Sequence, residues 1–323
     1  MLNLASVPAM RLAGRFGGSG VIINEHTLSQ EQTRLHVETL GRWFDFIALD
    51  DLPSRLQSPR RKPFCLLTFD DGKRSNATVT APELERHGAP AAFFLVSGFI
   101  DTPKPLWFDQ YRALTKQLGM DPAGLSSDIV KRLPHKLLTE RLERACRQHG
   151  VNVDLNDEDI CPMNWDLARD LHGRGFSIGA HGETHAILTR ETRSEALASI
   201  SASIARVSAE IGAPCGSFAF PNGNYTAELA MHATRCGAKI VMNTEPTWVT
   251  QALPLWRMPR IQLFGHQGSA EIEAKIALAA TGTFLANPDG TGRLYRSIRR
   301  MAKGRHKNLV GPSNSSQESV TEN

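Results

Sequence analysis

The sequence has no run of about 18 apolar residues, the length that a membrane-spanning helix requires. We therefore expect no transmembrane segment. The first 20 residues also lack the apolar core of a signal peptide, because Arg11 and Arg15 fall where that core would lie. These two absences favour a cytoplasmic protein.

The cysteines lack the spacing of a disulfide framework or of a thiolate metal site. There are five of them, an odd number, and no two form a Cys-x-x-Cys pair. Cys65 and Cys215 lie in or beside apolar runs, so we expect small buried thiols in a reducing compartment.

Acidic residues are missing from the segment 293–307, which contains seven basic residues. The whole chain has a formal net charge of +4, so its positive excess belongs to this segment. A basic tail is typical of peripheral contact with membrane headgroups, here at the inner face, or with an anionic polymer; a solvated tail is the alternative. We expect the Ser- and Asn-rich residues 311–323 to be disordered.

The 323 residues are 41% hydrophobic and 22% charged, which is ordinary for a globular protein and long enough for one large α/β domain. Apolar runs of strand length alternate with helical patterns, two of which open with capping boxes at Ser29 and Thr192. This alternation predicts a parallel sheet, and seven or so strand–helix units predict a barrel-like fold. The expected strands are 21–23, 44–49, 63–71, 91–96, 176–180, one ending at Phe220, 239–242 and 259–263, and the expected helices include 29–43, 77–87, one opening at Asn164, 192–211, 226–236 and 270–280.

Residues 101–162 break this rhythm, with helical patterns at 111–118 and 135–149 and polar linkers between them. We interpret them as an insertion that decorates one face of a single catalytic domain, residues 1–287. Residues 288–323 form the tail. The oligomeric state is left open.

Two carboxylates end a strongly apolar predicted strand, in the segment Thr68-Phe69-Asp70-Asp71-Gly72. Side chains alternate along a strand, so these carboxylates point apart unless the backbone turns, and Gly72 permits a turn. Two adjacent like charges favour a cation nearby. The alternative is a plain surface turn, in which Asp and Gly are common.

Two histidines, His181 and His185, follow the predicted strand 176–180 at a spacing of four. Their imidazoles converge on one ion if the chain turns helically after His181. Together with Asp71 they would form a three-ligand zinc site with an open position for water, which leaves Asp70 free to act as a base. A structural role is the alternative for each histidine. For His26, which follows the first strand, we favour capping or core packing over a place in the active site.

Taken together, these motifs and the segment Ser217-Phe218-Ala219-Phe220-Pro221-Asn222-Gly223-Asn224-Tyr225 resemble the first three motifs of the NodB-homology polysaccharide deacetylases, carbohydrate esterase family four. The resemblance extends over roughly residues 21–263. It implies a distorted (β/α) barrel and a metal-dependent enzyme that removes N-acetyl groups from sugars. By position it makes Asp71, His181 and His185 the metal ligands, Asp70 the general base, and the backbone N–H of Asn222 the donor to the oxyanion. Zinc is the expected ion, and cobalt or nickel suits the same ligands.

The sequence departs from this family at two positions. Ala219 stands where many relatives carry an arginine beside the catalytic aspartate, and Arg260 or Arg257 is expected to supply that charge. The family's acid is a histidine in an Ile-x-Leu-x-His motif, whereas His266 here lies one residue further along. His266 is nevertheless our candidate acid.

We expect the substrate to be the N-acetylhexosamine units of a polysaccharide, oligosaccharide or lipid-linked glycan, and we expect no nucleic-acid partner. Candidate substrate-binding residues are Asn222, Tyr225, Trp256 and Arg260, with core packing as the alternative for Trp256. Three alternative functions are a deformylase or deacylase of another amino sugar, a degenerate carbohydrate-binding relative without turnover, and a glycosyltransferase that uses the acidic pair. The last of these would not need the two histidines.

Overall fold

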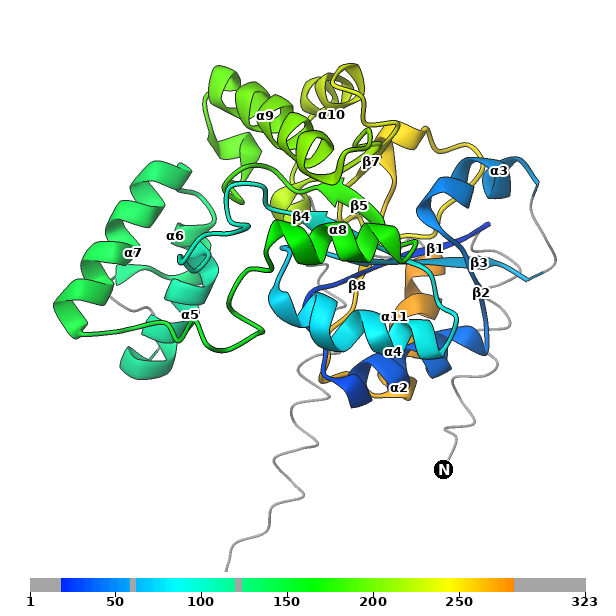
Figure 1. The fold of residues 1–323 in the computed structure, drawn as a ribbon, viewed down its shortest axis with the longest axis horizontal. Coiled ribbons are helices and arrows are strands. Elements are labelled where there is room, and N and C mark those ends of the chain that lie inside the picture. Colours follow the sequence, from blue (N-terminus) through cyan, green and yellow to red (C-terminus); the bar gives the residue numbers. More distant parts are fainter. Residues whose placement is uncertain (1–18, 59–61, 120–123, 282–323) are drawn as a thin grey trace, which may run out of the picture.

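A curled parallel sheet forms the centre of the computed structural model, which describes residues 19–58, 62–119 and 124–281 (Figure 1). Its strands are β1 (Gly20–Glu25), β2 (Asp45–Phe46), β3 (Phe64–Phe69), β4 (Ala91–Leu95), β5 (Ser177–Ala180), β6 (Ser217–Ala219), β7 (Ile240–Met242) and β8 (Ile261–Gln262). The helices are α2 (Gln30–Gly41), α3 (Leu52–Gln57), α4 (Ala81–Arg86), α5 (Trp107–Leu118), α6 (Ser127–Val130), α7 (His135–His149), α8 (Trp165–Gly173), α9 (Arg193–Ile211), α10 (Ala227–Arg235) and α11 (Ser269–Ala280). The tail predicted at 288–323, including its basic and Ser-rich parts, lies outside the described residues.

The strands lie in the order β7-β6-β5-β4-β3-β1-β8, and β2 pairs with β3 beside this row. All of these pairings are parallel. The segment entering β8 also meets the opposite end of the row, since the Met258 N–H donates to the Val241 carbonyl at 2.8 Å. The sheet therefore curls toward closure, which confirms the predicted distorted barrel.

Alternate residues of the central strands fill two separate apolar layers, as the two-residue period of a strand requires. In β3, Cys65 and Leu67 pack in the large core shared with the helices, whereas Phe64 and Leu66 pack in a second core with Phe94 of β4 and the other inward-facing residues. This double burial explains the unbroken apolar run from Phe64 to Leu67.

The local start signals of two helices are confirmed. Ser29 and Thr192 each accept a backbone N–H three residues ahead, and Gln32 and Glu195 reach back to the cap backbone. The strand predicted at 44–49 is confirmed only for Asp45–Phe46, which pairs with β3, so its predicted length was wrong. A short turn and α3 follow instead, with a proline in the first turn of α3, where its missing N–H costs nothing.

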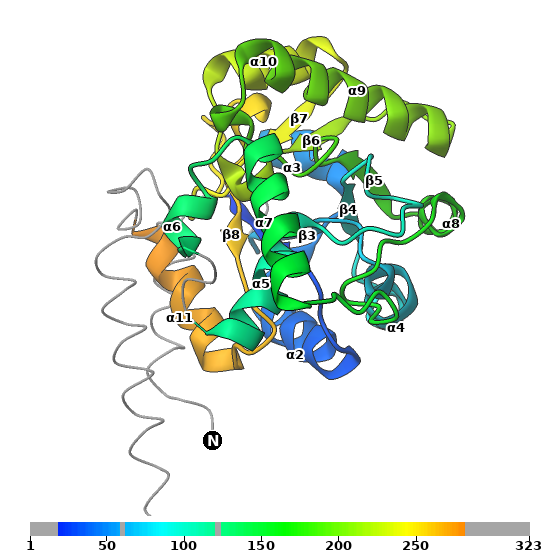
Figure 2. The ribbon, with the colours of Figure 1, turned by 90° about the vertical axis from the view of Figure 1, so that its left-hand side faces the viewer.

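The three helices of the predicted insertion, α5, α6 and α7, lie together at one end of the sheet (Figures 1 and 2). Their contacts form a separate apolar cluster of Trp107, Leu114, Leu125, Val130, Leu138, Leu142, Ala145 and Val151. Helix α7 has the predicted bounds, α5 begins four residues earlier than predicted, and α6 was not predicted. In the described part of the chain, no helix has the length and apolar character needed to cross a membrane.

Candidate metal centre

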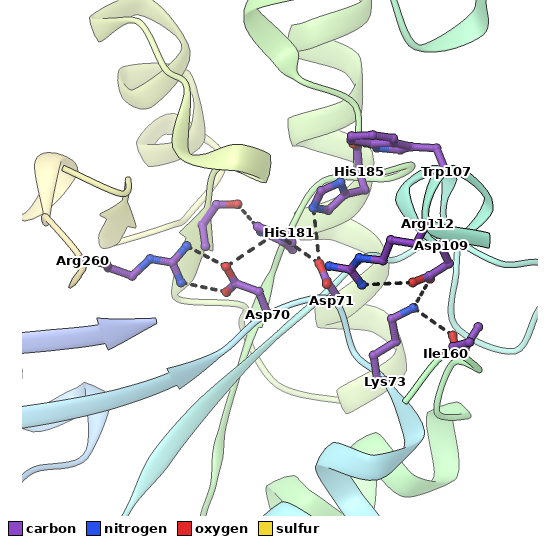
Figure 3. A network of polar contacts seen from close by, with 11 residues as sticks. Asp70, Asp71, Lys73, Trp107, Asp109, Arg112, Ile160, His181, His185 and Arg260 are labelled. Carbon is purple, nitrogen blue, oxygen red and sulfur yellow. Dashed lines mark hydrogen bonds and ion pairs between the residues drawn. The ribbon is translucent and has the colours of Figure 1, made fainter. Parts of the chain in front are cut away.

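The predicted metal ligands meet at the carboxyl ends of β3 and β5, which flank β4 in the sheet (Figure 3). Asp71 follows β3 and His181 follows β5, and the His181 N–H donates to the Leu95 carbonyl at the end of β4 at 2.8 Å. One ligand atom from each of Asp71, His181 and His185 lies within 4.8 Å of the others, and all three side chains are buried. The structure therefore brings together residues more than a hundred positions apart.

Left-handed backbone makes this convergence possible. Asp71 has φ +78° and Gly72 has φ +76°, so the turn begins one residue earlier than the sequence suggested. His185 has φ +58°, and the chain leaves His181 through a loop rather than through the expected helical turn. Such conformations cost non-glycine residues about 1–3 kcal/mol each and are typical of functional sites.

The protonation of His181 suits a metal ligand. Its Nδ1–H donates to the Ala219 carbonyl at 2.8 Å, which leaves the lone pair of Nε2 directed at the carboxylates. Burial lowers the pKa of His181 to about 4, although Asp70 opposes the shift. The imidazole is therefore neutral near pH 7, as metal binding requires.

The distances between these atoms fit a bound divalent metal. His185 Nε2 lies 3.3 Å and His181 Nε2 lies 3.7 Å from Asp71 Oδ1. Zinc bonds of about 2.0–2.1 Å in a tetrahedron separate two ligands by about 3.4 Å. Asp71 Oδ1 is buried and accepts no hydrogen bond within the described residues, so it needs a cationic partner.

The second carboxylate, Asp70, is held by Arg260 instead. Arg260 is fully buried and donates from its two terminal nitrogens to both oxygens of Asp70, at 2.7 and 2.8 Å. Burial alone would raise the pKa of Asp70, but Arg260 and His181 outweigh it and lower the pKa. Arg260 thus occupies the place expected for the missing family arginine, and its burial keeps it from contacting substrate.

A cavity of about 180 Å³ opens beside these residues. Its lining residues are Asn24, His26, Asp70, Trp107, Phe108, Arg112, Lys131, His181, His185, Phe220, Asn222, Thr244 and Gln262. His26 lies here because β1 and β3 pair in parallel with Glu25 opposite Phe69, so the residues that follow the two strands are neighbours. The Asn76 side chain fixes this turn by donating to the His26 carbonyl at 2.6 Å. The favoured capping or core role of His26 therefore disagrees with its position.

Of the remaining residues that the sequence suggested for the site, some line the cavity and others do not. Asn222 lines the cavity, whereas His266 is exposed, stacks on Phe264 and does not line it. Tyr225 donates its hydroxyl to Glu245 at 3.0 Å, and burial together with Glu245 raises the pKa of Tyr225 to about 12. Trp256 packs, half-buried, against the main core. Neither Tyr225 nor Trp256 lines the cavity.

Sequence reasoning did not single out the side chains that the insertion contributes. Trp107 Nε1–H donates to the His185 carbonyl at 3.1 Å, and the Phe108 ring meets the His185 ring edge to face at 5.0 Å. Both residues lie at the start of α5, and Arg112 follows one turn later. The adjacent aromatic pair Trp107-Phe108, at the entry to an amphipathic helix, was the available signal.

The chain matches the family model for polysaccharide deacetylase over residues 57–241, more than half of its length. The chain belongs to the polysaccharide deacetylase family. As a polysaccharide deacetylase it is a hydrolase of amide bonds with a carbohydrate substrate, as the sequence predicted. The matched segment includes Asp70, Asp71, His181 and His185.

Solved structures share the fold of this polysaccharide deacetylase. Deacetylase PplD of Streptococcus pyogenes, determined with acetate, superposes with a TM-score of 0.56 at 14% identity, covering 80% of this chain and 99% of PplD. IcaB of Ammonifex degensii gives 0.55 at 13% identity, with 82% and 97% covered. A de-N-acetylase of Aggregatibacter actinomycetemcomitans gives 0.54 at 14% identity, with 79% and 98% covered. No curated protein sequence matches the chain.

Proposed function

We propose that this polysaccharide deacetylase is a metal-dependent hydrolase that removes N-acetyl groups from N-acetylhexosamine units of a polysaccharide, oligosaccharide or lipid-linked glycan. The observation that carries the proposal is the convergence of Asp71, His181 and His185 beside the paired Asp70 and Arg260. A core that only binds sugar gains nothing from two buried carboxylates in contact with two imidazoles.

Asp71, His181 and His185 would hold the metal, with zinc as the expected ion and cobalt or nickel as ions that suit the same donors. A metal at this site supplies a Lewis acid that polarises an acyl carbonyl and lowers the pKa of water. The neutral His181 and the lowered pKa of Asp71, whose burial is outweighed by its contact with His185, keep these two donors deprotonated near pH 7.

Asp70 accepts the proton of the attacking water. Its two oxygens are fixed by Arg260, and its Oδ2 lies 3.7 Å from His181 Nε2, at the wall of the cavity. A carboxylate oxygen has lone pairs left after accepting one hydrogen bond, so Asp70 can bind water while Arg260 holds it. Arg260 is therefore a positioning residue.

Asn222 supports the oxyanion. It has φ +56° in the turn after β6 and lines the cavity. The next residue, Gly223, has φ +76°, and a Cβ there would lie 1.8 Å from Thr244 Oγ1, so only glycine leaves this turn in place. The turn is thus suited to present the Asn222 backbone N–H to the acyl oxygen.

His26 protonates the departing amine, a role that the sequence suggested for His266. Among the described residues that line the cavity, His26 is the imidazole outside the ligand set. A general acid must reach the leaving group, and the exposed His266 lies outside the cavity.

The test is acetate release from N-acetylglucosamine oligomers by protein loaded with zinc, after elemental analysis has established its metal content. We expect one metal ion per chain and one acetate released for each N-acetyl group removed. Formate release from N-formyl amino sugars alone would indicate a deformylase instead, and sugar binding without any product would indicate a degenerate relative. The cytoplasmic location and the membrane or polymer contact of the basic tail stay predictions.

A further inference from the structure

The cavity is lined by two cations, and only one of them, Arg112, contacts a carboxylate among the described residues. Two side chains of the insertion, Arg112 of α5 and Lys131, which follows α6, line the cavity. Asp70 is the one acidic residue among the described lining residues, and Arg260 already holds its carboxylate. An acetamido group is uncharged, so deacetylation alone does not explain these two cations.

Arg112 belongs to a cluster in which two cations, Lys73 and Arg112, share one carboxylate, that of Asp109 (Figure 3). Asp109 is buried and forms an ion pair with the buried Lys73, which also donates to the Ile160 carbonyl at 2.8 Å. Arg112 contacts the same carboxylate only at 3.4 Å, and its side chain stays 72% exposed. The cluster therefore has a net charge of about +1, located on the guanidinium that faces solvent.

The Arg112 guanidinium is held in place by the ring of Phe108. It lies 5.0 Å from the centre of the Phe108 ring, on whose face a cation is attracted. Phe108 in turn packs against His185, so the Phe108 ring contacts both Arg112 and a residue of the proposed metal site. Lys131 is exposed and forms no ion pair within the described part of the chain.

We propose that Arg112 and Lys131 form an anion subsite, so that the substrate is an amino sugar carrying a phosphate or a carboxylate close to its acetamido group. This inference rests on the proposed function, which it narrows to anionic substrates. A planar guanidinium binds two oxygens of either anion, and the ammonium adds a second, more flexible contact.

The experiment measures binding of three probes to the full chain by calorimetry: N-acetylglucosamine 1-phosphate, N-acetylmuramic acid and neutral methyl N-acetylglucosaminide. We expect at least one anionic probe to bind about tenfold more tightly than the neutral one, with a preference that falls as salt rises. Which of the two binds more tightly distinguishes phosphate from carboxylate. Equal affinities for all three would overturn the proposal.

The double variant Arg112→Gln/Lys131→Gln is expected to bind the three probes within about twofold of one another, because both charges are gone. Arg144→Gln is the matched control, since Arg144 is an exposed residue of the same insertion that does not line the cavity. An anion preference that survives the double substitution would show that another group, such as the metal, binds the anion, and would refute the subsite. Unchanged thermal unfolding confirms that the variants are folded.

Binding and turnover separate the two proposals. If no probe or oligomer releases acetate, the proposed function fails on these sugars, whereas the binding ratio still decides the anion subsite. If the neutral and anionic sugars are turned over with equal kcat/KM and bound equally, deacetylation stands and the subsite fails.

Discussion

The barrel and the insertion contribute to the cavity in different ways. The barrel supplies the residues of the reaction, each placed by the end of a parallel strand: Asp70 and Asp71 after β3, and His181 after β5. The insertion supplies further lining residues, among them Trp107 and Arg112, from helices with their own apolar cluster. We propose that the sheet sets the chemistry and the insertion the choice of substrate, and the predictions below test that division.

The largest effect is expected when a proposed metal ligand of the barrel is removed. Asp71→Asn is expected to lose the metal and to reduce acetate release on the order of 10⁴-fold, because several kcal/mol of charge stabilisation disappear. Asp70→Asn is the matched control: it is expected to retain the metal and still lose turnover. Elemental analysis with an acetate assay measures both, and full metal occupancy in Asp71→Asn would contradict the ligand assignment.

Loss of the proton donor is expected to have the next largest effect. His26→Asn is expected to lower kcat by about 10²- to 10³-fold, because the group that protonates the departing amine is removed. His266→Asn is expected to leave kcat unchanged. The opposite result, with His266 needed and His26 dispensable, would return the role to the residue that the sequence suggested.

The contact between the two regions is tested by Lys73→Met. This change leaves the buried Asp109 without its main cation and is expected to cost about 3–5 kcal/mol in the free energy of unfolding. Lys73→Met/Asp109→Leu is expected to recover most of that loss, because no uncompensated charge remains. Urea unfolding at pH 7 measures both, with the exposed Lys136→Met as control. A loss below about 1 kcal/mol in the single variant would show that the ion pair does not join the regions.

The pH dependence of stability compares one histidine from each region. Burial lowers the pKa of His181, and of His135 at the start of α7, to about 4. An unfolded imidazole binds a proton near pH 6.5, so the unfolded chain binds more protons between pH 6.5 and 4. The metal-free protein is therefore expected to lose stability as the pH falls through this window, by at most about 3 kcal/mol for each histidine.

His135→Asn is expected to remove only the insertion's share of this dependence, which urea unfolding at pH 7 and pH 4.5 would measure. A pH dependence identical to that of the wild type would show that His135 is not buried in its neutral form.

The smallest effect is expected at the helix caps. Thr192→Ala removes the capping box of α9 in the barrel and is expected to cost about 1 kcal/mol of global stability. Ser126→Ala removes the cap of the short helix α6 in the insertion. It is expected to increase local hydrogen exchange there and to leave the barrel amides unchanged. Equal changes throughout the chain would mean that the two regions unfold as one unit.

The sequence predicted the parallel sheet well because the relevant signals are local. Burial on both faces leaves a continuous apolar run in β3, and the caps at Ser29 and Thr192 depend on residues three positions apart. The strand predicted at 44–49 is shorter in the structure because only Asp45–Phe46 pairs with β3, and the residues after it turn into α3.

The missed site residues depend on contacts between distant segments. His26 lines the cavity only because β1 pairs with β3 in one particular register, which a single sequence does not reveal. Arg112 and Lys131 reach the cavity through the packing of α5, α6 and α7, which no sequence motif indicates. Asp71, His181 and His185, by contrast, were available as motifs at strand ends.

The buried pair of Lys73 and Asp109 has a consequence for how such enzymes diversify. Lys73 stands two residues after the proposed metal ligand Asp71, and Trp107 of the same helix as Asp109 donates to the carbonyl of another proposed ligand, His185. Deleting residues 101–162 would therefore leave the buried Lys73 without its carboxylate partner, and it would remove the hydrogen bond that holds the loop of His185. Homologues that have exchanged this segment for a different one are accordingly expected to carry an uncharged side chain where Lys73 stands, the two changes having been inherited together.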